Sequence, residues 1–80
     1  MFYYVYILQS LNFKDTYYVG FTSNIKRRLS EHNGGKSEYT SKYKPWKIKN
    51  AIAFDEEDKA IKFEKYLKSH SGRAFIKKHF

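Results

Sequence analysis

The absence of cysteine from a chain of only 80 residues is the strongest constraint on how this sequence can fold. Neither a disulfide framework nor a thiolate metal site can hold the chain together, so a single apolar core has to do so. Hydrophobic residues make up 41% of the sequence and aromatic residues 20%, and each buried aromatic side chain removes about 150–250 Å² from water. We therefore expect one compact domain over residues 1–80, with a core rich in Phe and Tyr.

Three segments have the composition of β-strands. Residues 2–9 and 16–20 are rich in Tyr and Val and are separated by a polar stretch, which predicts an antiparallel hairpin. The expected register places Leu8 opposite Thr16 and Tyr6 opposite Tyr18, and a slip of one residue would turn Tyr18 to the other face. Residues 46–54 alternate well enough to form a third strand.

Helical spacing appears in residues 25–32, where Arg28 and His32 share a face with Ile25 and Leu29. The following segment, 36–45, interleaves lysines and tyrosines and is expected to be an exposed basic loop. These residues lie between the first helix and the third strand.

A second helix is expected after four consecutive acids, with Asp55 as its N-cap. Its buried stripe of Ala60 and Leu67 includes Glu64. Ser71-Gly72 should then break the chain before a short basic helix over residues 73–80. The sequence therefore predicts an α/β (α+β) fold with a small three-stranded antiparallel sheet flanked by helices, in the order β-β-α-β-α-α.

Sixteen Lys and Arg residues against eight Asp and Glu residues give a formal net charge of +8, which favours a polyanionic partner. Nucleic acid is the first candidate, and anionic membranes are the less favoured one, because the aromatic residues alternate as in strands rather than lining one helical stripe. No run of about 18 apolar residues and no secretory signal pattern occurs, so we expect a cytoplasmic protein without membrane contact.

Polar groups on apolar helix faces point to a site. Arg28 and His32 lie on the inner face of the first helix and Glu64 on that of the second, and an unpaired buried charge costs several kcal/mol. Periodicity alone leaves alternatives open. Glu64 could form an exposed pair with Lys68, worth roughly 0.3–0.5 kcal/mol. Arg28 could be a structural arginine and His32 a core histidine.

The combined spacing of these residues resembles the GIY-YIG nuclease signature. Residues 4–6 read Tyr-Val-Tyr and residues 18–20 read Tyr-Val-Gly, and Arg28 and His32 follow Gly20 by eight and twelve residues, as in that family. The similarity covers nearly the whole chain and is strongest for small bacterial single-domain members. The sequence departs from the pattern at Tyr4, which replaces the glycine of the first tripeptide, and valines replace both isoleucines.

The resemblance implies a catalytic set of Tyr6, Tyr18, Arg28, His32 and Glu64. Glu64 would hold one Mg²⁺ or Mn²⁺, Arg28 would grip phosphate oxygens, and a tyrosine would take a proton from the attacking water. His32 would orient or polarise a tyrosine hydroxyl, and Asn33 is a lesser candidate. Residues expected to contact nucleic acid are Arg27, Lys36, Tyr39, Lys42, Tyr43 and Lys44.

The expected function is a metal-dependent endonuclease that is selective for structure or sequence, hydrolyses a phosphodiester bond in DNA and nicks one strand. The alternatives are a non-catalytic nucleic-acid-binding module with the same fold and a protein-interaction module that uses exposed tyrosines. No small-molecule cofactor is expected, because neither a Walker loop nor a Gly-rich dinucleotide turn occurs. We expect a monomer or weak dimer.

Overall fold

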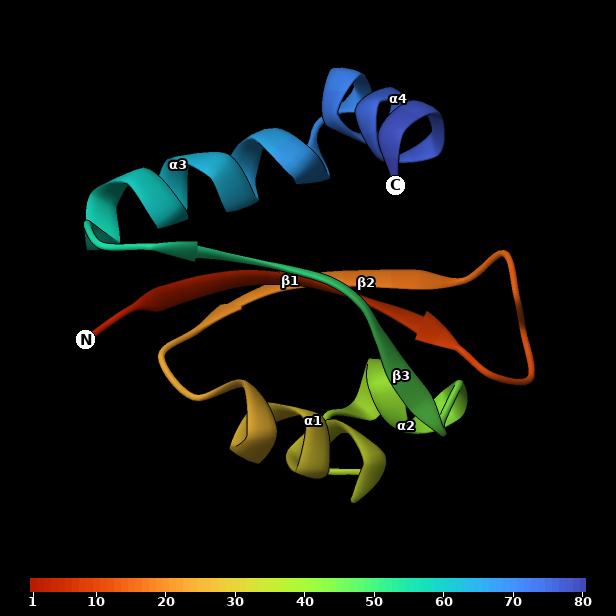
Figure 1. Ribbon diagram of the computed structural model, residues 1–80. Coiled ribbons are helices and arrows are strands. Elements are labelled where there is room, and N and C mark those ends of the chain that lie inside the picture. Colours follow the sequence, from red (N-terminus) through yellow and green to blue (C-terminus); the bar gives the residue numbers. More distant parts are fainter.

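The computed structural model describes residues 1–80 and has the predicted fold class, a three-stranded antiparallel sheet between helices (Figure 1). The sheet has the strand order β2-β1-β3. The elements along the chain are β1 (Tyr3–Ser10), β2 (Tyr17–Thr22), α1 (Ile25–Asn33), α2 (Glu38–Lys42), β3 (Trp46–Phe54), α3 (Glu57–Lys68) and α4 (His70–His79). None of the helices is long and apolar enough to cross a membrane.

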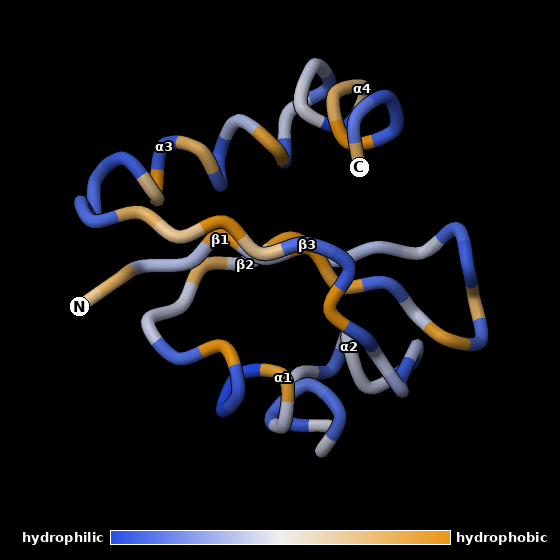
Figure 2. Tube along the Cα trace, in the orientation of Figure 1, coloured by the Kyte–Doolittle hydropathy of each residue, from blue (hydrophilic) through white to orange (hydrophobic).

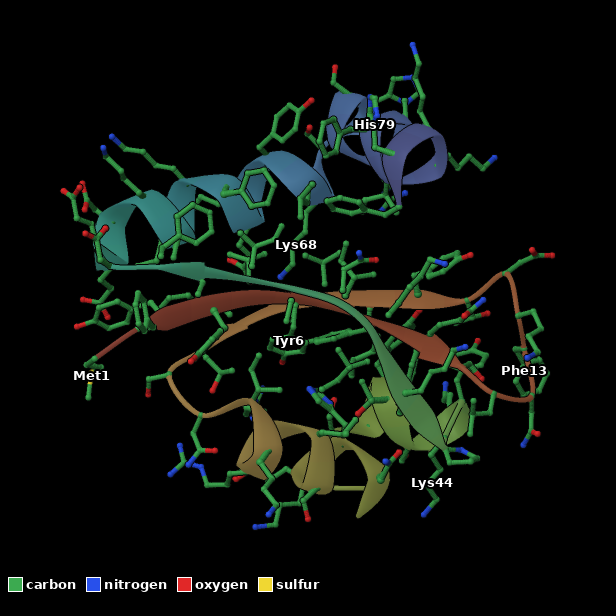
Figure 3. The ribbon with its side chains drawn as sticks, viewed as in Figure 1. Met1, Tyr6, Phe13, Lys44, Lys68 and His79 are labelled. Carbon is green, nitrogen blue, oxygen red and sulfur yellow. The ribbon has the colours of Figure 1, made fainter.

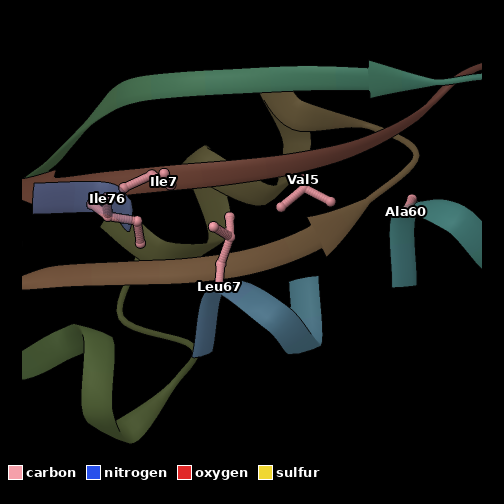
Figure 4. Close-up of a cluster of buried hydrophobic side chains, with 5 residues drawn as sticks. All are labelled: Val5, Ile7, Ala60, Leu67 and Ile76. Carbon is pink, nitrogen blue, oxygen red and sulfur yellow. The ribbon is translucent and has the colours of Figure 1, made fainter. Parts of the chain in front are cut away.

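Helices cover both faces of the sheet. Figure 1 shows α3 and α4 on one side and α1 and α2 on the other, and in Figure 2 the hydrophobic segments run through the strands between these layers. Alternation along β1 sends Val5 and Ile7 toward α3 and α4, where they join Ala60, Leu67 and Ile76 in one core cluster (Figure 4).

The opposite face of β1 carries the second cluster. Tyr6 and Leu8 pack there with Trp46, and Tyr18 and Leu29 lie against them. All three central residues are buried, with at most 3% of their surface exposed. A buried phenol needs a partner for its hydroxyl, so this layer has to supply polar groups as well as apolar ones.

The hairpin register differs from the predicted one by two residues. Leu8 pairs with Tyr18 and Tyr6 with Gly20, whereas we expected Leu8 opposite Thr16 and Tyr6 opposite Tyr18. The hairpin closes at Ser10, whose amide donates to the Thr16 carbonyl at 3.0 Å. Because side chains alternate with a period of two, a shift of two residues leaves every side chain on its predicted face.

The segment predicted as an exposed loop, residues 36–45, contains the short helix α2. Its sequence gives no strong helical period, and its N-cap Ser37 makes no side-chain capping bond. Tertiary contacts hold it instead: Thr40 is fully buried, and its carbonyl accepts a hydrogen bond from Trp46 Nε1 at 2.8 Å. The expectation of a loop was therefore wrong for Glu38–Lys42.

Two predicted helix boundaries are also corrected. The N-cap of α3 is Glu56 and not Asp55, and acidic Glu57 and Asp58 occupy the first turn. Ser71 and Gly72 lie inside α4 and do not precede it. The helical run is interrupted earlier, at Ser69, which ends α3 and begins α4. The Ser69 side chain accepts from the Gly72 amide at 3.1 Å and caps α4.

Gly72 lets α4 lie directly against the end of α3. A Cβ atom added at this residue would overlap the backbone carbonyl of Tyr66 and the Cα of Leu67. We therefore predict that Gly72→Ala lowers the free energy of unfolding by about 1–3 kcal/mol, as overpacked cores do. Denaturant unfolding of the variant measures this loss. Gly34→Ala, where a Cβ would come no nearer than 3.2 Å to another atom, should cost clearly less, and equal losses would contradict the prediction.

Candidate active site

The side chain of Tyr6 crosses the edge strand β2 at Gly20. The two residues are paired in the sheet, and a Cβ atom at Gly20 would fall on the hydroxyl and ring of Tyr6. Only glycine lets the phenol lie across the strand in this way. The pairing carries the Tyr6 hydroxyl to the α1 side of β2.

His32 forms a hydrogen bond with the Tyr6 hydroxyl. Its imidazole is 1% exposed, Nε2 lies 3.0 Å from the Tyr6 Oη, and Nδ1 lies 3.1 Å from the Thr40 Oγ1. The Thr40 hydroxyl donates its own proton to the Ser37 carbonyl, so it accepts from His32. We therefore assign the proton to Nδ1, and Nε2 accepts from the Tyr6 hydroxyl.

Burial keeps both members of this pair neutral. Removal from water lowers the pKa of His32, and the neighbouring Arg28 charge lowers it further. Burial also raises the pKa of Tyr6, against the opposing effect of the Arg28 guanidinium. At neutral pH the site therefore contains an uncharged phenol bound to an uncharged imidazole.

Arg28 supplies the fixed positive charge. It projects from α1, interacts with the Tyr6 hydroxyl, and donates from Nη1 to Glu31 Oε1 at 2.9 Å. Hydrogen bonds to Tyr6 and Glu31 raise the pKa of Arg28 above its ordinary value. The hydrogen bond from Arg28 lowers the pKa of Glu31, so the ion pair between Arg28 and Glu31 persists at neutral pH. The Arg28 side chain is 38% exposed, which leaves guanidinium donors accessible from solvent.

Tyr18 and Glu64 complete the set from two different layers. The Tyr18 ring lies 4.8 Å from the His32 ring, between their centroids, and Lys68 Nζ lies 6.0 Å from the Tyr18 centroid. Lys68 extends from α3, on the far side of the sheet from Tyr6 (Figure 3). The α3 layer thus reaches Tyr18 around the edge strand β2.

Glu64 lies one turn before Lys68 on α3 and accepts from its Nζ at 3.0 Å. The Glu64 side chain is 19% exposed, and its charge contributes to the raised pKa of Tyr6. The pair that periodicity left open is therefore formed. Four of the five predicted residues, Tyr6, Tyr18, Arg28 and His32, lie against one another, and Glu64 is linked to them through Lys68 beside the Tyr18 ring.

The donor set fits a weakly held hard cation. No group of three or more His, Cys, Asp or Glu residues surrounds a point, so the protein alone offers no cage for a metal ion. Magnesium commonly binds through one or two carboxylates and completes its shell with water and substrate phosphate. The Glu64 carboxylate suits that mode, because part of it faces solvent.

The lesser candidate Asn33 has a structural contact. Its Oδ1 accepts from the Trp46 amide at 2.6 Å, and its Nδ2 donates to the Trp46 carbonyl at 3.2 Å. These two bonds tie the end of α1 to the start of β3. Asn33 thereby fixes the position of the helix that carries Arg28 and His32.

The residues predicted to contact nucleic acid lie mostly on the surface. Arg27, Lys36, Lys42 and Lys44 are exposed, and Arg27 forms a loose pair with Glu31. The Tyr39 ring is half exposed, whereas the Tyr43 ring is partly buried between Phe13 and Tyr39.

Sequence reasoning missed three residues that shape the site. Thr40 fixes the His32 tautomer, Gly20 makes room for Tyr6, and Glu31 holds Arg28. The position of Glu31, three residues after Arg28, was the available signal for an ion pair. Nothing local marked Thr40, because its partner is eight residues away and α2 was not expected.

Comparison with known proteins agrees with this geometry. The GIY-YIG catalytic domain, as a family, matches residues 2–78. The chain belongs to the GIY-YIG family. This is a nuclease family, and the family resemblance found in the sequence is thereby confirmed. The catalytic roles of the individual residues stay predictions.

Several relatives support this GIY-YIG assignment. A UPF0213 protein of Streptococcus agalactiae is 35% identical over 80 residues, which cover 95% of this chain and 89% of the relative. The structure-specific endonuclease subunit SLX1 of Vanderwaltozyma polyspora is 39% identical over 79% of this chain, although the match spans only 22% of that protein. The solution structure of a UPF0213 protein from Bacillus halodurans superposes with a TM-score of 0.56 at 29% identity, over 95% of this chain and 82% of that one.

The buried His32 of this GIY-YIG domain predicts a loss of stability in mild acid. Because the folded pKa of His32 lies below the unfolded value of about 6.5, the unfolded chain binds a proton first as the pH falls. The contribution of neutral, buried His32 to the free energy of unfolding is fully present above about pH 6.5. It is lost as the pH falls through the pKa that His32 has in the folded protein. Denaturant unfolding at pH 7.5, 6.5 and 5.5 measures the slope.

The matched variants separate this effect from other titrations. His32→Gln should be less stable than the parent at pH 7.5 and should lose less stability on acidification. Replacement of the exposed His70 by Gln should leave the parent slope unchanged. An unaltered slope in His32→Gln would contradict the assignment of a buried neutral imidazole.

Proposed function

We propose that this protein is a metal-dependent endonuclease that hydrolyses a phosphodiester bond in DNA and nicks one strand. The observation that carries the proposal is the contact network at the β2 edge, where Tyr6, His32, Arg28 and Tyr18 meet and Glu64 lies next to Tyr18 through its ion pair with Lys68. Membership of a nuclease family and the net charge of +8 support a nucleic-acid substrate.

Arg28 binds the substrate phosphate. Its planar guanidinium matches two phosphate oxygens, and its accessible donors can exchange the Glu31 carboxylate for a phosphate. The Tyr6–His32 pair holds this guanidinium from the buried side, so that its position does not depend on the substrate. Charge that develops on the phosphate in the transition state is then met by a preorganised donor.

Tyr18 relays the proton of the attacking water: its hydroxyl oxygen takes that proton while its own hydroxyl proton passes to solvent. The Tyr6 hydroxyl already donates to His32, and a charged His32 is disfavoured by burial and by Arg28, so proton transfer through that pair is costly. The Tyr18 ring is only partly buried, and it lies between the His32 ring and Lys68 at the edge of the site, where its hydroxyl can meet a water. The water oxygen bonds to phosphorus, the bond to the departing oxygen breaks, and the departing oxygen is protonated from solvent.

Glu64 would hold the divalent cation, Mg²⁺ or Mn²⁺, and as a single carboxylate it would bind the cation weakly. The cation would supply Lewis-acid stabilisation of the phosphate. With one such site per chain, one strand would be cut. The name of the yeast relative supports selectivity for DNA structure as the first possibility to test.

A second candidate is a nucleic-acid-binding module that has the fold without turnover. The observation that favours it is the ion pair between Glu64 and Lys68, which occupies one oxygen of the proposed metal ligand. Such a module would bind DNA through its positive surface with an affinity that falls steeply with salt. The two candidates differ in the expected effect of removing the Glu64 charge. An endonuclease should lose cleavage, whereas a binding module should function unchanged.

The Glu64 charge is therefore the first feature to test. We predict that Glu64→Gln lowers the rate of cleavage of nicked, branched, flapped and single-stranded DNA by at least about 100-fold in Mg²⁺ or Mn²⁺, because the metal loses its protein ligand. Gel electrophoresis of labelled substrates measures cleavage. Glu57→Gln removes the same charge from the exposed first turn of α3 and should retain the parent rate.

Binding assays without metal complete this experiment. Glu64→Gln should bind DNA at least as tightly as the parent, because a negative charge has been removed. If neither protein cuts any substrate but both bind, the non-catalytic module replaces the endonuclease. Absence of salt-sensitive binding would remove both candidates.

The role of Tyr18 yields a separate prediction. Tyr18→Phe keeps the ring that packs against His32 and Trp46 but removes the hydroxyl, so the rate should fall by about 10²–10⁴-fold with little change in thermal stability. The rate is compared with that of Tyr39→Phe, which loses a hydroxyl from a half-exposed neighbouring ring. Equal small effects in both variants would exclude Tyr18 as the proton acceptor.

A further inference from the structure

An open groove of about 900 Å³ is lined by Tyr18 and its neighbours in β2, by the end of α3 and by α4, with single residues from α2 and β3. Tyr18 and Lys68, which belong to the proposed active site, line one part of it. Arg73 and Lys77 of α4 line another part. The groove therefore connects the site of proposed hydrolysis with the basic C-terminal helix, whose charges the mechanism does not use.

The charge of the groove is strongly positive. Its lining includes Lys49, Lys68, Arg73 and Lys77, whereas Asp15 is its only acidic residue. Lys49, Arg73 and Lys77 form no ion pair, and Lys68 alone is neutralised, by Glu64. Three uncompensated cations along one depression attract a polyanion and not a neutral ligand.

Aromatic rings lie among these cations. Tyr17 and Tyr39 are 37% and 49% exposed, and Phe80 also lines the groove. Leu67 and Ile76 contribute an apolar floor. Proteins bind unpaired nucleic-acid strands in grooves that combine cationic side chains with accessible aromatic rings, because bases stack on the rings and phosphates contact the cations.

We infer that this groove binds an unpaired segment of the DNA strand, next to the bond that is cut. The inference rests on the proposed function and adds to it a substrate class, DNA with a single-stranded stretch beside the scissile phosphate. A paired helix hides its base faces in the stack, so it cannot use the exposed tyrosines. An acidic peptide would satisfy the cations but leave the rings without stacking partners.

The test measures binding alone, in the Glu64→Gln background and without metal, so that its result does not depend on cleavage. The probe is a fluorescent single-stranded oligonucleotide, followed by anisotropy over a range of salt concentrations. We predict that the pair Arg73→Gln and Lys77→Gln weakens binding at least about fivefold and lowers the salt slope by about 1.4, since each lost phosphate contact on a single strand removes about 0.7.

The control carries the same change of charge elsewhere. Lys62→Gln with Lys65→Gln alters two exposed cations of α3 that do not line the groove. These variants should bind within about twofold of the parent. Equal weakening by both pairs, or no weakening by the α4 pair, would overturn the inference. So would duplex DNA or polyglutamate that competes as well as the single strand.

Stacking is tested by Tyr17→Ala. Loss of one base–aromatic stack should weaken the single strand by about fivefold or more, whereas duplex affinity should not change. Phe2→Ala removes another half-exposed aromatic ring, outside the groove, and should have no effect. A Tyr17→Ala variant with unchanged single-strand affinity would contradict the groove as a stacking site. Cleavage by the parent with Glu64 intact reports separately on the proposed function.

Discussion

The structure depends on one buried hydrogen bond, from the Tyr6 hydroxyl to His32. A phenol hydroxyl that is removed from water without a partner costs about 1–3 kcal/mol, so the surrounding elements have to deliver an acceptor to one point. Gly20 provides the path across β2, α1 provides the imidazole, and Thr40 of α2 fixes its tautomer. The Tyr6–His32 hydrogen bond thus constrains the hairpin register and the rotation of α1. Through Thr40 it also constrains the position of α2, whose sequence has little helical tendency.

The two residues of this hydrogen bond are neutral, and the charged residue of the site lies next to them. Tyr6 and His32 stay uncharged because they are buried, and the one permanent charge beside them, Arg28, lies at the solvent boundary with Glu31 as its partner. A buried cation without a partner would be too costly, whereas a partly exposed cation with an exchangeable carboxylate is tolerated. This arrangement keeps a positive charge accessible to solvent without burying it unpaired.

The sequence predicted the elements whose pattern is local. Alternation placed the three strands and the faces of Tyr6 and Val5, and helical spacing placed Arg28 and His32 on the inner side of α1. It did not predict α2, the register or the capping of α4. Each of these depends on a specific contact that hydropathy patterns do not encode, namely Trp46 with Thr40, Gly20 with Tyr6, and Ser69 with the Gly72 amide. The candidate site residues could be selected from the sequence because the family spacing adds information that periodicity lacks.

The edge of the sheet is where the chemistry can be assembled. Helices α1 and α3 lie on opposite faces of the sheet, and at the edge strand β2 Lys68 of α3 reaches the ring of Tyr18, which packs against His32 of α1. The position of Glu64 is then set by the packing of α3 on the sheet through Ala60 and Leu67. The stability of this apolar layer and the geometry of the candidate site are therefore coupled. A domain of this size has one core, so any shift of α3 on the sheet also shifts the Glu64 carboxylate.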